Sequence, residues 1–441
     1  MTPDILFEPI RFKSLTVKNR LWRSNISGRF DGYDGSGSQT RINWELKFAR
    51  NGVGAIISSW CGVDLQGRIV PGYASIDRDD RIPFWRELGK QVHEHDCRYI
   101  LQLAHAGRQR DVPGFEIEKG LSSTNKSDPL HGFECERMTV EQIGEVTRSF
   151  ALAARRARDA GLDGVEIHAA NGYLFTQFLS SAINDRDDDY GGSLESRARF
   201  LLEVVSAIRT EVGEDYHLQV KISATEHNNA ALPWAEKGNT IEDSVQVCRW
   251  LEQAGVDAIH VSTGSTFPHP LNPAGAFEPK EAAEGYDTLL SSGKHAFRNY
   301  LLMRTFPLNR FFTWRWDKPE VEAIEGAQLD DSRQIKRSVG IPVLCTGGFQ
   351  RASLIRSAIE RRDCDAVTIA RPLVANNDLV RIFEEGHDYP ARPCSYCNRC
   401  LNNVLEFPLG CYDQRRYLSK ETMIAEIMSV YEPSPFQDRD T

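Results

Sequence analysis

Three polar residues near the middle of the sequence could carry out hydride and proton chemistry together. His168 and Asn171 follow an apolar run, three positions apart, and Tyr173 comes two positions later. The His and Asn side chains can act as neutral hydrogen-bond donors, which suits the polarisation of a carbonyl or nitro oxygen as negative charge develops on it. A phenol such as that of Tyr173 can deliver a proton to the carbon opposite hydride attack. The His-x-x-Asn spacing alone is a weak signal, because a single histidine at a strand end is as often structural.

A second set of residues could bind a phosphate group. Gly347-Gly348 stands before a helix-like segment, and Ala370-Arg371 ends the following strand-like run. Together they supply backbone N–H groups, a helix N-terminus and a guanidinium, at the position where barrel enzymes commonly bind phosphate. The glycine pair on its own would equally fit a tight turn.

These candidates lie in or just after short apolar runs. Gln102 and Lys221 lie within such runs, where they could offer hydrogen bonds to the edge of a bound ring system and hold negative charge there. Near-continuous apolar runs are typical of strands covered on both faces, and barrel enzymes carry their active residues at the carboxyl ends of strands. The eight runs are Arg20–Ile26, Val53–Ser59, Tyr99–Leu103, Gly164–His168, Leu218–Ser223, Ala258–Ser262, Pro342–Thr346 and Ala366–Ala370.

Helical periodicity separates these runs. Apolar residues recur at three- and four-residue spacing in the intervening segments, which is typical of amphipathic helices. Eight strands each followed by a helix predict a closed α/β fold, the (β/α)8 TIM barrel, rather than an open sheet. The clearest helical segments are Val140–Ala160, Leu194–Val212, Ile241–Ala254 and Ala352–Arg361.

Two segments do not follow this alternation. Residues 267–329 separate the sixth strand from the helix before the seventh, and they are rich in aromatic residues and arginine. A loop that long is usually a lid, a binding loop or an interface. Residues 391–441 lack the barrel periodicity and carry a cysteine cluster. We therefore expect a barrel over residues 1–390, with a long insertion after strand 6, and a cysteine-rich C-terminal extension over residues 391–441.

The composition limits the classes of function. Of the 441 residues, 41% are hydrophobic and 26% are charged, which is typical of a globular protein with a large core. The formal net charge of −9 argues against nucleic acid or an anionic membrane as the main partner. The sequence has no signal-peptide core and no apolar run long enough to span a bilayer. These features predict a soluble cytoplasmic protein that acts on a small molecule.

The ten cysteines are unevenly distributed. Six are scattered singly, whereas Cys394, Cys397, Cys400 and Cys411 lie within one short C-terminal stretch. A disulfide framework would spread its cysteines through a small secreted chain, so this cluster predicts a metal site in a reducing compartment. Four thiolates at this spacing suit a [4Fe–4S] cluster, and they also suit a tetrahedral zinc ion or no metal at all.

Longer stretches of the sequence resemble the old yellow enzyme family of FMN-dependent oxidoreductases. Leu6–Arg20 is similar to the opening of the family, and Leu103–Arg108 (Leu-Ala-His-Ala-Gly-Arg) matches a family signature. The most specific match is Val165–Phe200, which contains the three polar residues named first. The resemblance covers roughly residues 5 to 390, apart from the insertion.

The resemblance implies an enzyme that passes hydride from NAD(P)H through FMN to an activated C=C bond, such as that of an α,β-unsaturated carbonyl. It implies that His168 and Asn171 bind the electron-withdrawing oxygen and that Tyr173 donates the proton. The residues expected to bind FMN are Asn25, Ile26, Ser27, Trp60, Gln102, Lys221, Gly347, Gly348, Ala370 and Arg371.

Several of these positions depart from the family pattern. Ser27 stands where the family has Thr or Cys, which weakens an expected hydrogen bond to the flavin, and Asn25 replaces a usual Pro. Lys221 replaces the commoner Arg, which keeps the charge but loses the bidentate fork. Trp60 occupies a position that is small in many members and aromatic in some amine-dehydrogenase relatives. We expect Trp60 to narrow the pocket and to disfavour bulky substrates.

The cysteine cluster resembles the iron–sulfur segment of the branch that contains 2,4-dienoyl-CoA reductase and trimethylamine dehydrogenase. Cys394-Ser-Tyr-Cys397-Asn398 is close to the motif of that branch. Relatives in this branch continue into a second flavin domain and a nicotinamide-binding domain, for which this sequence has no Gly-x-Gly-x-x-Gly motif after the cluster. We therefore expect that a bound cluster exchanges electrons with a separate partner or is structural.

Two alternatives to an NAD(P)H-dependent ene-reductase remain open. An amine-type dehydrogenase would run the flavin in the oxidative direction and pass electrons through an Fe–S cluster to a separate carrier, and Trp60 with the aromatic insertion would suit a cation. A barrel with a zinc-bound cysteine knob would instead use that knob to dock a protein. A homo-oligomer is compatible with these interpretations, and no nucleic-acid or membrane partner is expected.

Overall fold

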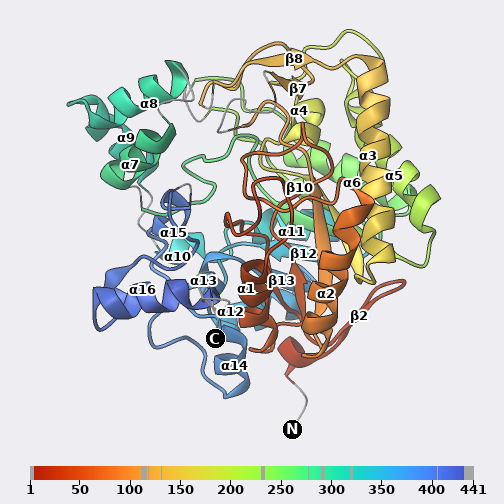
Figure 1. Ribbon diagram of the computed structural model, residues 1–441. Helices are drawn as coiled ribbons and strands as arrows, with labels where there is room; N and C mark the ends of the chain where they lie inside the picture. Colours follow the sequence, from red (N-terminus) through yellow and green to blue (C-terminus); the bar gives the residue numbers. More distant parts are fainter. Residues whose placement is uncertain are drawn as a thin grey trace, which may run out of the picture.

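The computed structural model of the protein describes residues 4–110, 117, 119–130, 132–229, 234–276, 278–289, 294–317, 321–404 and 406–431. Eight parallel strands form a closed barrel, because the last strand, β13, pairs with the first, β3 (Figure 1). All eight predicted strands are present, which confirms the (β/α)8 architecture. In order around the barrel they are β3 (Leu21–Arg23), β4 (Ala55–Ile57), β6 (Arg98–Ala104), β9 (Gly164–Ala169), β10 (His217–Ser223), β11 (Ala258–Ser262), β12 (Val343–Thr346) and β13 (Ala366–Ile369).

Helices connect the strands and cover the outside of the barrel. The four helices predicted from periodicity are present with ends within one residue of the prediction. One of them, α3, begins after Thr139, which forms a reciprocal cap with the side chain of Gln142. The helices of the barrel are η1 (Ile5–Phe7), α1 (Gln39–Ala49), η2 (Asp79–Arg81), α2 (Ile82–His93), α3 (Val140–Asp159), α4 (Leu174–Leu179), α5 (Leu194–Val212), α6 (Ile241–Gln253), α11 (Leu329–Lys336), α12 (Ala352–Glu360), α13 (Arg371–Ala375) and α14 (Leu379–Glu384).

A small hairpin closes the amino-terminal end of the barrel. Its strands β1 (Ile10–Arg11) and β2 (Thr16–Val17) pair antiparallel. Phe12 in the turn packs against Trp22 of β3, with ring centroids 5.5 Å apart, inside a buried apolar cluster to which most of the barrel strands contribute. Because this cluster fills the lower end, a ligand must enter the barrel from the carboxyl-terminal ends of the strands.

The insertion and the C-terminal extension both contain short helices. The prediction of a long loop over residues 267–329 was wrong in this respect, because α7 (Pro279–Leu289), α8 (Lys294–Arg304) and α9 (Leu308–Trp316) pack on one another beside the barrel (Figure 1). The insertion ends with α10 (Val321–Ile324), and the extension contains α15 (Arg399–Asn402), η4 (Gln414–Arg416), α16 (Lys420–Met428) and η5 (Ser429–Tyr431). The division into a barrel over residues 1–390 and a separate extension over residues 391–441 stays a prediction.

Three short strands complete the fold. β5 (Cys61–Gly62) extends the main sheet beside β6, and β7 (Gly120–Ser122) pairs in parallel with β8 (Cys135–Arg137). In the described part of the chain, no helix combines the length and the apolar character that crossing a bilayer requires.

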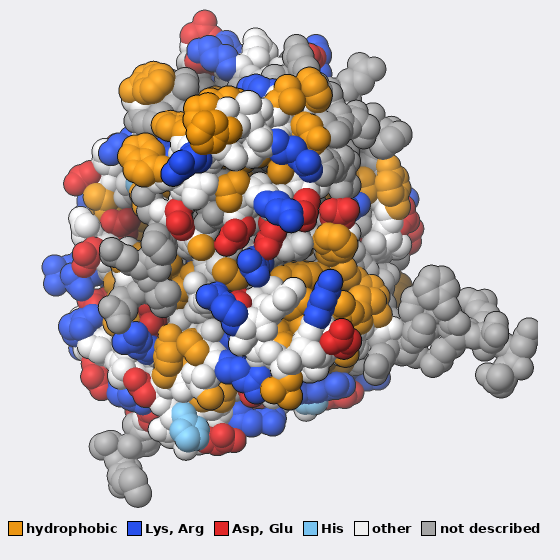
Figure 2. Space-filling view, turned by 90° about the vertical axis from the view of Figure 1, so that its left-hand side faces the viewer, with side chains coloured by type: hydrophobic (Ala, Val, Ile, Leu, Met, Phe, Trp, Pro, Cys, Tyr) orange, Lys and Arg blue, Asp and Glu red, His pale blue; other side chains and the backbone are white. Residues whose placement is uncertain are grey.

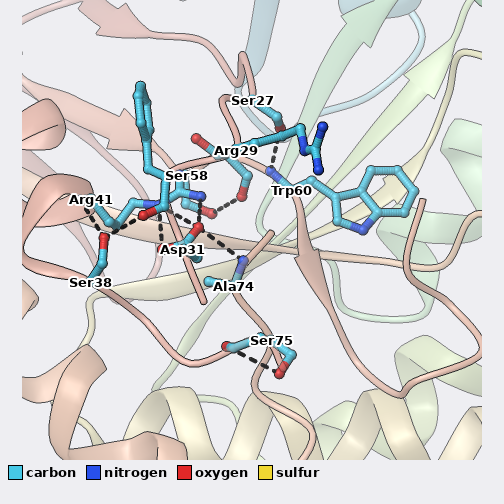
Figure 3. A network of polar contacts seen from close by, with 12 residues as sticks. Ser27, Arg29, Asp31, Ser38, Arg41, Ser58, Trp60, Ala74 and Ser75 are labelled. Atoms are coloured by element: carbon cyan, nitrogen blue, oxygen red, sulfur yellow. Dashed lines mark hydrogen bonds and ion pairs between the residues drawn. The ribbon is translucent and has the colours of Figure 1, made fainter. Parts of the chain in front are cut away.

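A buried polar network fixes the loop between β3 and α1, which carries three of the predicted cofactor residues (Figure 3). Arg41 on α1 donates hydrogen bonds to both carboxylate oxygens of Asp31, and the backbone N–H of Ala74 donates to the same carboxylate at 3.0 Å. Ser38 caps α1 by accepting the backbone N–H of Arg41. Because the Asp31 and Arg41 side chains are almost completely buried, each compensates the charge of the other, and Glu45 lies 3.6 Å from the same guanidinium.

We predict that Asp31→Ala lowers the free energy of unfolding by about 3 kcal/mol, because it leaves the Arg41 guanidinium buried without this carboxylate. Urea denaturation would measure the change. Asp80→Ala is the matched control, since Asp80 forms an exposed pair with Arg78 that contributes at most about 1 kcal/mol. Equal losses of stability in the two variants would contradict the importance of the buried network.

Candidate active site

A cavity of about 230 Å³ opens at the carboxyl-terminal ends of the barrel strands. It lies at the end of the barrel opposite the apolar cluster, where there is room for a ligand. Its wall includes all three predicted catalytic residues and nine of the ten predicted cofactor residues. These are His168, Asn171 and Tyr173, together with Asn25, Ile26, Ser27, Trp60, Lys221, Gly347, Gly348, Ala370 and Arg371.

His168 is placed to act as a neutral hydrogen-bond donor. Its side chain is only 2% exposed, and burial together with the charge of Lys221 holds the pKa of His168 well below its usual value. The ring nitrogen Nδ1 accepts the backbone N–H of Ala170 at 3.3 Å. In the neutral ring this contact assigns the remaining proton to Nε2. His168 can therefore donate from Nε2 to an oxygen in the cavity.

Asn171 has an orientation that the sequence did not indicate. Its side-chain amide group donates to the hydroxyl of Ser262 at 3.2 Å and to the carbonyl of Thr263 at 2.8 Å. Since the Thr263 carbonyl can only accept, these contacts fix which side-chain atom is nitrogen. The side-chain oxygen of Asn171 is thus the atom left for a ligand. For Asn171 to donate a hydrogen bond to a substrate oxygen, as predicted, its side-chain amide would have to rotate and give up both contacts.

Three aromatic rings form one wall of the cavity. The rings of Trp60 and Tyr173 meet edge to face with centroids 4.4 Å apart, and the His168 ring lies 4.9 Å from Tyr173 and 5.7 Å from Trp60. The backbone N–H of Trp60 donates to the hydroxyl of Ser27 at 2.9 Å, which ties this wall to the loop after β3 (Figure 3). Trp60 is 3% exposed, so its bulk occupies space beside the two polar rings.

Lys221 places a buried ammonium group in the cavity wall. Its Nζ atom donates to the side-chain oxygen of Asn25 at 2.5 Å. Burial lowers the pKa of Lys221 to about 8, and the negative charge of Glu166 limits this decrease. Lys221 is therefore mostly charged at neutral pH, and it can supply a hydrogen bond and a positive charge to an anionic ligand.

A carboxylate inside the barrel supports this lysine. Glu166 is fully buried and accepts hydrogen bonds from the side chains of Gln102 at 2.7 Å, Gln219 at 2.5 Å and His260 at 2.7 Å. Burial disfavours the charged carboxylate, but His260, Lys221 and the hydrogen bond from Gln102 outweigh it, so that the pKa of Glu166 lies below its usual range.

His260 completes this interior layer. Burial lowers its pKa, so the ring is neutral and donates from Nδ1 to Glu166, while Nε2 accepts from one of the hydroxyls of Thr346 and Thr368, which also bond to each other. Sequence reasoning missed both Glu166 and His260. The signal was available for Glu166, because it lies two positions before His168 on the same strand and so points to the same side.

Gln102 is the predicted cofactor residue that does not line the cavity. It is fully buried in the layer around Glu166, and its side-chain oxygen has no hydrogen-bond partner. The sequence placed Gln102 within a strand-like run, but it could not show that the side-chain amide of Gln102 donates a hydrogen bond to the interior carboxylate. Direct contact of Gln102 with a cofactor stays a prediction.

The predicted phosphate-binding residues are held by the C-terminal extension. Arg371 donates to the carbonyl of Ala274 at 2.7 Å and to the side-chain oxygen of Asn398 at 2.5 Å. The hydroxyl of Tyr396 donates to the carbonyl of Gly348, and the Arg371 guanidinium lies over the Tyr396 ring. Leu401 and Val404, which were not predicted, also line the cavity. The extension is thus part of the wall of this site.

The four clustered cysteines line a second, smaller cavity beside the first. Arg371 borders both cavities, and the smaller one is lined by Cys394, Cys397, Cys400 and Cys411. Burial raises the pKa of the Cys394 thiol to about 11. No group of three or more His, Cys, Asp or Glu side chains in the described ranges is gathered in a way that would hold a metal ion as it stands. The four thiols share a cavity without converging on a single point.

Comparison with known proteins agrees with this architecture. Residues 5–286 match the NADH:flavin oxidoreductase / NADH oxidase family. An NADH oxidase of Thermoanaerobacter brockii is 32% identical over 397 residues, which are 89% of this chain and 52% of that protein. A cinnamate reductase of Clostridium sporogenes is 26% identical over 450 residues, which are 97% of this chain and 61% of that protein. The chain thus spans roughly half the length of these curated relatives.

A solved structure has the same fold. The old yellow enzyme homologue from Zymomonas mobilis superposes with a TM-score of 0.67 at 21% identity, over 92% of this chain and 99% of that chain. Because the family match covers more than half of the sequence and the barrel agrees with it, the protein belongs to the NADH:flavin oxidoreductase / NADH oxidase family, as its resemblance to old yellow enzyme implied.

Proposed function

We propose that the protein binds FMN and uses NAD(P)H to reduce an activated C=C bond. The observation that carries this proposal is the shared cavity, in which a neutral histidine donor, a tyrosine and a buried lysine face one space. The names of the two relatives, an NADH oxidase and a cinnamate reductase, support the same class of reaction.

The residues of the cavity fit FMN in chemical character. Ile26 and Trp60 offer apolar surface to a ring system, and Lys221 offers a buried positive charge to its pyrimidine edge. Gly348 has a φ of +67°, and a Cβ there would lie 3.2 Å from Ile324, so this turn of the cavity wall requires glycine. Arg371 lies in the same wall and supplies a cation for that phosphate.

The side chains of the cavity would then divide the reaction between them. Bound FMN supplies the capacity to take a hydride from NAD(P)H and return it to carbon. The Nε2–H group of His168 would donate a hydrogen bond to the electron-withdrawing oxygen of the substrate and so stabilise the negative charge that develops there. Tyr173 would give a proton to the alkene carbon next to the one that receives hydride. The aromatic wall would exclude water from the reacting atoms.

The orientation of Asn171 favours a second candidate function. Because its carbonyl oxygen is the atom left for a ligand, Asn171 as it stands suits a substrate that carries an N–H donor. An amine oxidised in this cavity would satisfy that oxygen, and the electrons would pass to a separate carrier. Anaerobic bleaching of the bound flavin by amines but not by NADH or NADPH would establish this alternative in place of the first.

We predict that Tyr173→Phe slows the step in which an activated alkene restores the visible absorbance of the FMN-loaded protein after anaerobic bleaching with NADH or NADPH. Loss of a positioned proton donor costs roughly 100-fold or more. Stopped-flow spectroscopy would measure both steps, and bleaching itself should be unchanged.

Tyr73→Phe is the matched control for this test, because Tyr73 lines the same cavity without an assigned role. An unchanged rate of recovery in Tyr173→Phe would remove the proposed proton donor. A protein that takes up no FMN would refute the proposed function as a whole.

We predict that the affinity for FMN falls by about fivefold between pH 7 and pH 9, because Lys221 loses its proton as the pH rises through its pKa of about 8. Below this pKa the ammonium group is present and the hydrogen bond to the cofactor is charge-assisted. Quenching of FMN fluorescence at a series of pH values would give the dissociation constants. Lys221→Arg should keep high affinity at pH 9, whereas Lys221→Met should bind weakly at both pH values; a wild-type affinity that does not change with pH would contradict the role of Lys221.

The cysteine cavity is proposed to hold a [4Fe–4S] cluster. A single zinc ion would gather four sulfur atoms roughly 3.8 Å apart, given Zn–S bonds of about 2.3 Å. A cluster of four irons and four sulfides spreads its thiolate ligands over a larger volume, which suits four cysteines around one cavity. Such a cluster would exchange electrons with a separate carrier protein or serve as a structural brace.

We predict that protein prepared without oxygen contains iron and acid-labile sulfide, and that Cys397→Ser loses most of both. Metal and sulfide analysis would measure this, with Cys135→Ala as a control because Cys135 lies outside the cluster in the fold. One equivalent of zinc in place of iron, or an unchanged iron content in Cys397→Ser, would reject the cluster.

A further inference from the structure

The helical insertion carries large apolar side chains that point to the solvent. Figure 2 shows such side chains gathered on the face of the molecule to which the insertion belongs. Two of them, Trp314 and Phe306, are 72% and 71% exposed. The six exposed residues, which we call the α8–α9 surface, are Phe297, Leu301, Phe306, Leu308, Phe311 and Trp314.

This exposure is not the result of a loosely attached segment. The opposite side of the same two helices is buried against the barrel connections, where Trp316 packs with Leu130 and is 7% exposed. The side-chain amide of Asn299 donates to the carbonyl of Leu130 at 2.9 Å, and Arg298 donates to the carbonyl of Pro129 at 2.9 Å. The helices are therefore anchored on one side, and the apolar residues lie on the other.

The charged residues of the α8–α9 segment itself have one dominant sign, and Glu284 of the neighbouring α7 lines a cavity with Arg304. Between residues 297 and 317 the sequence has four arginines, at positions 298, 304, 310 and 315, and a single acidic residue, Asp317. The whole chain, by contrast, has a formal net charge of −9. The expectation that no anionic membrane binds was drawn from that total, and it does not apply to a surface where the local charge is positive.

We propose that the α8–α9 surface binds the face of an anionic phospholipid bilayer. Aromatic and leucine side chains alternating with arginines are what an interfacial segment needs, because the rings enter the boundary of the acyl chains while the guanidinium groups remain at the phosphates. Two helices of 11 and 9 residues are too short to cross a bilayer, so the segment lies in the plane of the headgroups. The turn between α8 and α9 presents Phe306 at its tip.

The same charges disfavour a second copy of the chain as the occupant. In a symmetric dimer built on this surface, each patch would face its own copy, so the exposed Arg304 and Arg310 would oppose their own copies. A bilayer of acidic lipids instead offers phosphates to Arg304 and Arg310 at once, while Arg298 and Arg315 donate to backbone carbonyls on the anchored side. The inference is independent of the proposed function, because it uses no residue of the active-site cavity.

Sedimentation with vesicles tests the proposal. The full-length protein is mixed with vesicles of phosphatidylglycerol and phosphatidylcholine, or with vesicles of phosphatidylcholine alone. We expect binding to the anionic vesicles, weaker binding to the neutral ones, and a decrease as the salt concentration rises. The double variant Phe306→Ser/Trp314→Ser should lose roughly tenfold in partitioning, and Arg310→Gln about fivefold.

Trp234→Ser is the matched control, because Trp234 is 82% exposed at a position outside the insertion. It should bind vesicles as well as the wild-type protein does. Binding that is absent from anionic vesicles, or that falls equally in Trp234→Ser and in the double variant, would overturn the proposal. The protein could instead form a dimer that the double variant converts to a monomer, without binding vesicles. That result would show that the surface is an interface between two copies of the chain.

Discussion

A single buried carboxylate organises the interior of this barrel. Glu166 is fully buried inside the barrel, where an ionised group would be costly without partners. Gln102, Gln219 and His260 satisfy it, and its charge keeps Lys221 protonated at neutral pH in spite of burial. The electrostatic character of the cavity therefore depends on a residue that does not line it.

The fold was predictable because its signals are local and repeated. Each barrel strand is a short apolar run, and each α/β connection brings helical periodicity, so a predicted strand such as Ala258–Ser262 agrees with the structure residue for residue. The insertion was harder to predict, since helices as short as α9 have only a few turns in which periodicity can appear. Their formation depends on packing against one another, which a sequence pattern does not contain.

The sequence predicted which residues come together in the site, because their positions at strand ends follow from the barrel, but it did not predict how their side chains are oriented. The closed barrel brings Asn25, Lys221 and Arg371 to one rim although they are far apart in the sequence, and this follows from topology. Side-chain orientation does not follow in the same way. The side-chain amide of Asn171 donates to Thr263, and that of Gln102 donates a hydrogen bond to Glu166. Both orientations are set by neighbours on other strands, which the spacing within one segment does not reveal.

Tyr396 and Asn398 join the cysteine segment to the part of the cavity wall that contains Gly348 and Arg371, the predicted phosphate-binding residues. Both residues lie between or beside the clustered cysteines, and both touch the backbone or side chains that border the larger cavity. A displacement of the cysteine segment would therefore act on Gly348 and Arg371 through these two side chains. The two cavities have a wall in common, and the packing of one bears on the shape of the other.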